Sequence, residues 1–238
     1  MMWRLLLVIA VLANTLALAA QTEAESDKSP FHPAETASVT DITVPVAGNG
    51  TVVLDALITD KGEVQKVELR RDIASLTPLV VQAVQDWKFS PATLDGKAVA
   101  SRMPVAVTFR PPGSAAPVPL PALTPQSDAA IQAEFQPAEV TRAVFPRYPD
   151  TTVVAGAVVL EVTLSEKGEA ENVKVLRDLP PLTDEAKAVV GSFRFMAATF
   201  NGKPVGSKIV LAFVSQPLAT PLSMSHGSSG NCHRARGK

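Results

Sequence analysis

The sequence predicts an α+β fold made of two tandem small domains, each a three-stranded antiparallel sheet covered by one helix (β-β-α-β). Residues 50–111 align with residues 156–217 without a gap, so the chain carries this stretch twice. Turn glycines, a helix start and an aromatic-x-Phe pair recur at matching positions in both copies. Turns, caps and apolar positions that recur together are typical of a duplicated domain.

Two strands open each copy. In the first copy, residues 51–59 alternate loosely, with Val52, Leu54, Ala56 and Ile58 on one face, which predicts a strand. Residues 64–69 return as a second strand with Val67 and Leu69 facing inward, after a turn at Gly62. Because the link between them is so short, the two strands must be antiparallel.

A helix and a third strand complete each copy. The Thr77 and Thr183 hydroxyls are expected to cap the helices, and Pro78 occupies a position where a missing N–H costs nothing. Asp-Gly and Asn-Gly turns then lead into third strands at residues 100–109 and 206–214. The residues expected on the buried helix faces and at the helix ends are Val80, Val84, Trp87, Phe89, Ala186, Val190, Phe193 and Phe195.

Composition sets the boundaries. We expect a signal peptide at residues 1–20, a flexible lead-in at 21–32, repeat 1 at 33–112, a Pro/Ala-rich linker at 113–136, repeat 2 at 137–217 and a disordered tail at 218–238. Residues 129–135 could add one helical turn to the linker.

The N-terminus predicts export. Arg4 precedes an apolar run at residues 5–18, and Ala17-Leu18-Ala19 provides a small-x-small cleavage site. The run is shorter than the ~20 residues of a membrane-spanning helix. The expected location is therefore periplasmic or secreted, with membrane association only if the leader is retained.

The residues available for chemistry argue against an enzyme. All three histidines and the one cysteine, Cys232, lie outside the two aligned stretches, so these cannot hold a histidine triad, a thiol nucleophile or an ordinary zinc site. No cofactor is expected. The net charge of −1 supplies no basic stripe for nucleic acid.

The pattern resembles the TonB C-terminal domain family. The resemblance is carried by Pro146-Arg147-Tyr148-Pro149, Gly156 before a strand, Lys167-Gly168 at the turn and Phe193-Arg194-Phe195 after the helix. It implies a domain that grips an extended segment of an outer-membrane receptor by strand addition. The energy-transducing members have a membrane anchor and a long Pro/Lys/Glu-rich spacer, whereas this leader looks cleavable and little chain separates it from repeat 1.

The resemblance also places the third strand at the free edge of the sheet. Repeat 1 has Pro104 in that strand, which cannot complete a ladder, whereas repeat 2 has Val210 there. We therefore prefer repeat 2 as the peptide-binding module, with a protein partner. Its expected peptide-binding residues are Pro146, Tyr148, Pro149, Ile209, Val210, Leu211, Ala212 and Phe213. Two alternatives stay open: a structural or self-associating envelope protein, and a membrane-anchored energy transducer.

Overall fold

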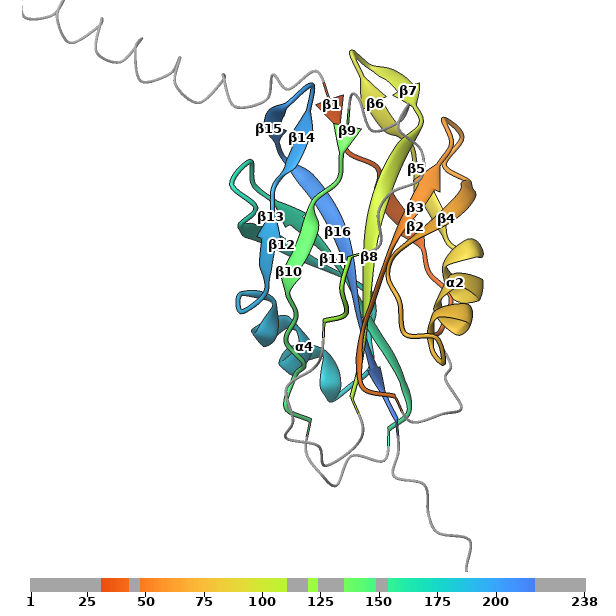
Figure 1. The fold of residues 1–238 in the computed structure, drawn as a ribbon, viewed down its shortest axis with the longest axis vertical. Helices are drawn as coiled ribbons and strands as arrows, with labels where there is room; N and C mark the ends of the chain where they lie inside the picture. The colour runs from red at the N-terminus through yellow and green to blue at the C-terminus, as the bar shows by residue number, and fades with distance from the viewer. Residues whose placement is uncertain (1–30, 43–47, 111–119, 124–134, 149–153, 217–238) are drawn as a thin grey trace, which may run out of the picture.

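A computed structural model of the chain describes residues 31–42, 48–110, 120–123, 135–148 and 154–216. The predicted leader, the tail with Cys232 and most of the linker lie outside these ranges. A six-stranded sheet forms the centre, in the order β12-β11-β16-β8-β3-β4 (Figure 1). Its strands are β3 (Gly50–Ile58), β4 (Val64–Arg71), β8 (Ser101–Phe109), β11 (Gly156–Leu164), β12 (Ala170–Arg177) and β16 (Ser207–Ser215).

Each repeat has the predicted β-β-α-β core. Strands β3, β4 and β8 are antiparallel neighbours in repeat 1, as β11, β12 and β16 are in repeat 2. The helices are α2 (Thr77–Gln85) and α4 (Leu182–Val190). Both copies therefore share one topology, and the α+β fold class is confirmed.

Short strands flank each core in the same order. Repeat 1 adds β1 (Phe31–His32), β2 (Glu35–Ser38), β5 (Lys88–Ser90), β6 (Ala92–Leu94) and β7 (Lys97–Val99). Repeat 2 adds β9 (Phe135–Gln136), β10 (Glu139–Arg142), β13 (Arg194–Met196), β14 (Ala198–Phe200) and β15 (Lys203–Val205). The Asp-Gly and Asn-Gly turns join β6 to β7 and β14 to β15. Positive φ angles at both residues of each turn suit a tight hairpin.

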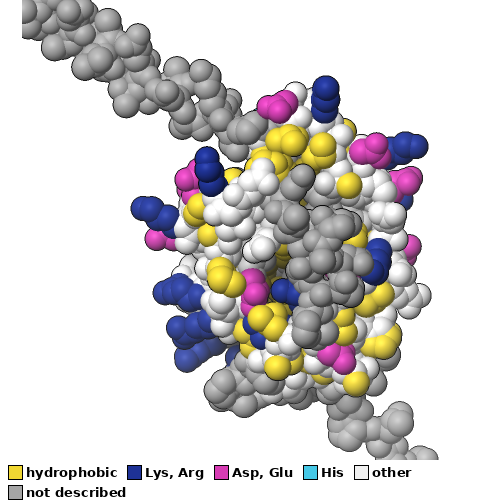
Figure 2. All heavy atoms as spheres, turned by 45° about the horizontal axis from the view of Figure 1, so that its top comes forward, with side chains coloured by type: hydrophobic (Ala, Val, Ile, Leu, Met, Phe, Trp, Pro, Cys, Tyr) yellow, Lys and Arg dark blue, Asp and Glu magenta, His cyan; other side chains and the backbone are white. Residues whose placement is uncertain are grey.

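Ordered structure begins earlier than the sequence suggested. Phe31, expected in a flexible lead-in, is buried and pairs with Leu94. Phe135, expected in a helical turn of the linker, pairs with Phe200. The Phe31 ring stacks on Phe200 and contacts the tilted ring of Phe135 at the hairpin end of the molecule, where Figure 2 shows hydrophobic side chains gathered. This apolar contact orders both segments.

The two repeats are joined through their third strands. Strand β16 pairs with β8 in parallel, from Val210 beside Val105 to Val214 beside Phe109. This pairing is not predicted by the sequence pattern. It makes one continuous sheet from two three-stranded ones.

The parallel join places the helices on opposite faces of the sheet (Figure 1). One core cluster combines Val80 and Val84 of α2 with Val159, Val210 and Ala212 of repeat 2. The other combines α4 and its sheet face with Val53 and Ala106 of repeat 1. Each repeat therefore buries apolar side chains of the other.

The predicted threonine caps take a different form. Neither helix has a side-chain cap hydrogen bond. The Thr77 hydroxyl instead accepts a hydrogen bond from the Ile73 N–H (3.0 Å), and Thr183 accepts one from the Leu179 N–H (2.9 Å). The threonines close the loop that precedes each helix, which corrects the expected role.

The helix-end aromatics pack mainly as predicted. Trp87, Phe89 and Phe193 are buried, together with the predicted helix-face residues. Phe195 is only partly buried and stacks on Phe193, with ring centroids 5.9 Å apart. The core assignment is confirmed for the first three and holds only in part for Phe195.

Candidate functional site

The predicted peptide-binding strand is not an edge. Ile209, Val210, Leu211, Ala212 and Phe213 all lie in β16 and are buried. Strand β11 pairs with β16 on one side, and β8 pairs with it on the other. The expectation that the third strand is the free edge is therefore wrong, because the third strands of the two repeats occupy each other's edges.

Pro104 consequently has a different role from the one expected. It lies in β8 opposite Asp55 of β3, and the parallel pairing with β16 starts at the next residue, Val105. Pro104 does not guard an open edge. A signal for the internal position was present in the sequence, because residues 209–214 form an uninterrupted apolar run, which is typical of a strand buried on both faces.

The Pro-Arg-Tyr-Pro motif packs against the core of repeat 2. Pro146 is buried, Tyr148 is half-buried, and Pro149 lies outside the described residues. Phe145 bridges the Tyr148 ring (5.3 Å) and the Phe213 ring (6.1 Å) with edge-on contacts. Burial raises the pKa of the Tyr148 phenol. Most of the described motif is thus a packing element that supports β16 from one face.

Within the described residues, the open edges of the central sheet are β4 and β12. These are the second strands of the two repeats and lie at opposite ends of the strand order. An edge strand leaves alternate main-chain N–H and C=O groups unpaired, which is a template for adding another strand. The fold therefore has one candidate docking edge per repeat.

A pocket of about 400 Å³ lies beside β12. Val175 lines it from the strand, Pro180 and Pro181 from the loop that follows, and Asp184 and Lys187 from α4. Asp178 and Thr183 complete the lining. This site was not among the predicted ones, although the sequence carries one signal for it: Pro180-Pro181 replaces Ala74-Ser75 of the aligned repeat.

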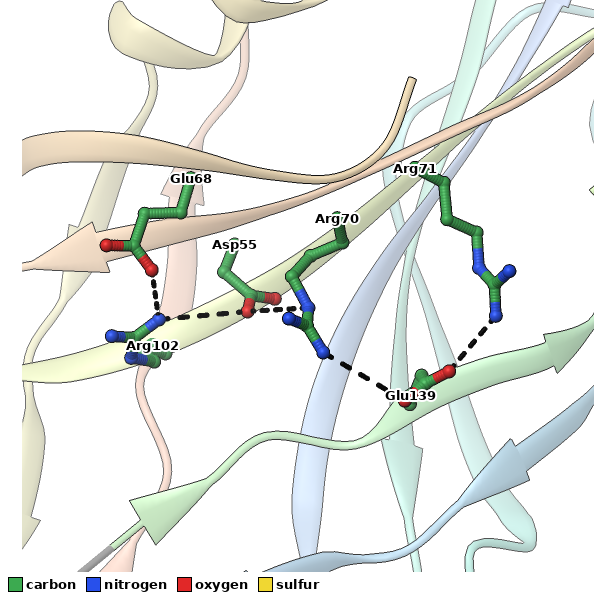
Figure 3. A network of polar contacts seen from close by, with 6 residues as sticks. All are labelled: Asp55, Glu68, Arg70, Arg71, Arg102 and Glu139. Carbon is green, nitrogen blue, oxygen red and sulfur yellow. Dashed lines mark hydrogen bonds and ion pairs between the residues drawn. The ribbon is translucent and has the colours of Figure 1, made fainter. Parts of the chain in front are cut away.

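Buried charges hold the second repeat against the first (Figure 3). On the sheet face of repeat 1 that α2 leaves uncovered, Arg102 lies between Glu68 and Asp55. Arg70 reaches Asp55, with Nε to Oδ2 at 3.6 Å. Glu139 of β10, in repeat 2, accepts a hydrogen bond from Arg71 (3.0 Å). Repeat 2 thus supplies a carboxylate to a charged network inside repeat 1.

The reverse contact comes from β2 of repeat 1. Its Glu35 pairs with Lys208 of β16, and Lys208 also lies 3.3 Å from the buried Glu161. The hydrogen bond from Lys208 lowers the pKa of Glu35, against the opposing effect of desolvation. The Thr36 N–H donates to Glu161. Glu35 and Glu139 occupy matching Pro-Ala-Glu segments, so the crossed contacts follow the duplication.

The described residues assemble no metal-binding cluster of His, Cys, Asp or Glu. His32, the one histidine among them, is exposed on β1. The described helices also lack the length and apolar character needed to cross a bilayer. The features that remain are two open sheet edges and a pocket beside one of them.

These features define a two-module α+β protein whose accessible sites suit contact with another chain. A family model described as "Gram-negative bacterial TonB protein C-terminal" matches residues 47–111 and 141–214, together more than half of the chain. The chain belongs to this family, and the tandem resemblance is confirmed. The family consists of non-enzymatic protein-interaction domains associated with the cell envelope. No curated protein and no solved structure matches the chain.

Proposed function

We propose that the chain is a non-enzymatic, exported TonB-like protein that binds an extended segment of a protein partner by strand addition. A segment of an outer-membrane transporter is the partner that the family suggests. The observation that carries the proposal is the pair of open edges, β4 and β12, left by a sheet whose third strands pair with each other. Repeat 2 remains the preferred module, with β12 in place of β16.

The proposed mechanism uses main-chain hydrogen bonds for affinity and side-chain pockets for choice. Strand β12 has eight residues and pairs with β11 on its inner side. An extended peptide on its outer side would extend the sheet by one strand. The pocket beside Val175 would then receive a side chain of that peptide.

The alternative is a structural protein with protected edges. Lys66 of β4 and Lys174 of β12 are exposed on the edge strands, and edge lysines are a known device against unwanted pairing. A protected edge should bind no extended peptide, so the two functions differ in one measurable property.

Proline scanning of the edge strands tests the proposal. Proline removes the N–H that an added strand needs. Asn172→Pro and Val173→Pro sample both N–H directions in β12. Lys66→Pro and Val67→Pro are the matched variants in β4. Fluorescence anisotropy would measure the binding of labelled heptapeptides that copy periplasmic segments of outer-membrane transporters.

We expect the variant of β12 with an outward N–H to retain its circular dichroism and melting temperature while losing at least tenfold in peptide affinity. The variant with an inward N–H breaks the pairing with β11 and should melt earlier, so melting identifies which is which. Unchanged affinity in every correctly folded variant of both edges would contradict strand addition.

A further inference from the structure

The pocket beside β12 differs in chemistry from the aligned position in repeat 1. Pro180 and Pro181 of the lining replace Ala74 and Ser75, and Lys187 replaces Val81. The prolines give the wall an apolar surface that cannot donate a backbone hydrogen bond. Any ligand preference of this pocket should therefore belong to repeat 2 alone.

The size and position of the pocket suit one side chain of an added strand. Directly opposed residues of neighbouring strands have Cβ atoms about 4.5–5.5 Å apart. A peptide residue opposite Val175 would therefore direct its side chain along the face of the sheet that α4 covers. The volume of about 400 Å³ is near the lower limit of small-molecule sites, and one long side chain can occupy it.

The charges of the lining favour a cation. Asp184 already has a partner, because its Oδ1 lies 3.5 Å from Lys187 Nζ. Asp178 is exposed, and the two basic side chains described nearby pair with other carboxylates, Arg177 with Asp41 and Lys187 with Asp184. Its repeat 1 counterpart, Asp72, accepts a hydrogen bond from the Thr77 hydroxyl (2.7 Å), whereas the described contact of the Thr183 hydroxyl is with the Leu179 N–H. The Asp178 carboxylate is left available to a ligand.

We infer that this pocket selects peptides that place an arginine or lysine side chain opposite Val175. The aliphatic stem would lie over Val175 and the two prolines, while the charged head reaches Asp178 at the rim. An apolar residue would satisfy only the walls, and an acidic residue would meet Asp178 with like charge. This inference rests on the proposed strand addition and names the chemistry of its partner.

Three synthetic peptides test the inference. The probe is the labelled heptapeptide Thr-Val-Thr-Arg-Thr-Val-Thr, and its two analogues carry norleucine or glutamate in place of arginine. Anisotropy titrations with the purified chain should give the affinity order arginine, norleucine, glutamate. An equal affinity for the arginine and glutamate peptides would overturn the inference.

Two variants at the pocket should act in opposite directions. Asp178→Asn should weaken binding of the arginine peptide roughly two- to fivefold, the range of an exposed ion pair, and leave the norleucine peptide unaffected. Lys187→Ala removes a competing cation and should strengthen binding of the arginine peptide. The control is Asp86→Asn, an exposed acid at the end of α2, with no expected effect. No change in Asp178→Asn would contradict the role of Asp178.

The same titrations separate this inference from the function beneath it. Peptides that bind with dependence on the β12 proline variants, but without preference for arginine, would overturn the pocket assignment alone. Peptide binding that depends on the β4 proline variants instead would also overturn the pocket assignment, but it would still support strand addition. Absence of binding by all three peptides at millimolar concentration would count against both.

Discussion

Residues 137–217 expressed alone are expected to lack a stable monomeric fold. Without repeat 1, the strand edge of β16 and the sheet face with Val159, Val210 and Val214 lose their cover. Burying a valine contributes about 1.5–3 kcal/mol, so these three amount to about 5–9 kcal/mol. That loss is comparable to the whole stability of a typical domain, about 5–15 kcal/mol.

Thermal unfolding followed by circular dichroism, with size-exclusion chromatography, would measure this effect. The control is the same fragment mixed with residues 31–112, which should restore cooperative unfolding. A lone repeat 2 that remains monomeric and melts like the full chain would show that the repeats are independent.

The second large effect is expected for Phe213→Ala. Phe213 is fully buried in β16 and meets the rings of Phe145 (6.1 Å) and Phe193 (5.9 Å) edge-on. Its truncation leaves a cavity in the core of repeat 2 and should cost about 3–5 kcal/mol. Chemical denaturation would measure the free energy of unfolding.

Phe195→Ala is the matched control, since Phe195 is partly exposed and stacks on one face of Phe193. It should destabilise the chain clearly less. Loss of peptide binding by Phe213→Ala with stability unchanged would contradict the internal position of β16 and favour a direct contact with ligand.

Local sequence signals predicted the elements of each repeat. The positive φ of Gly62 and Gly168 and the Asp-Gly and Asn-Gly hairpins are properties of a few adjacent residues, so the sequence reveals them. Thr77 and Thr183 were placed correctly at the helix starts, but their hydroxyls bond backward along the chain. Each hydroxyl could cap its helix or accept a hydrogen bond from the preceding loop. The outcome depends on the conformation of that loop, which helix propensities do not define.

Local sequence patterns could not predict how the two repeats pair with each other. The pairing of Val105 with Val210 joins strands from different copies. No sequence spacing predicts which distant strands will pair. The apolar run of β16 indicated burial on both faces, but the resemblance to the family placed this strand at a free edge. The crossed ion pairs of Glu35 and Glu139 were equally invisible, because their partners lie in the other repeat.

The candidate binding strands differ from the predicted one for the same reason. Once β8 and β16 occupy each other's edges, strand addition is left to β4 and β12. The lining of the β12 pocket comes from a strand, a loop and a helix, and only folding brings Val175, Pro181 and Lys187 together. The replacement of Ala74-Ser75 by two prolines is visible in the sequence. Linking these prolines to a binding pocket requires knowing that β12 is an open edge.

Residue-resolved amide hydrogen exchange, with and without the arginine heptapeptide, tests the central claim most directly. In the free chain, consecutive amides from Val210 to Val214 of β16 should all be protected, since this part of the strand is paired on both sides, while alternate amides of β12 exchange quickly. Addition of the peptide should then protect the fast amides of β12 and leave β16 unchanged. Fast alternate amides between Val210 and Val214 that become protected by the peptide would contradict the account.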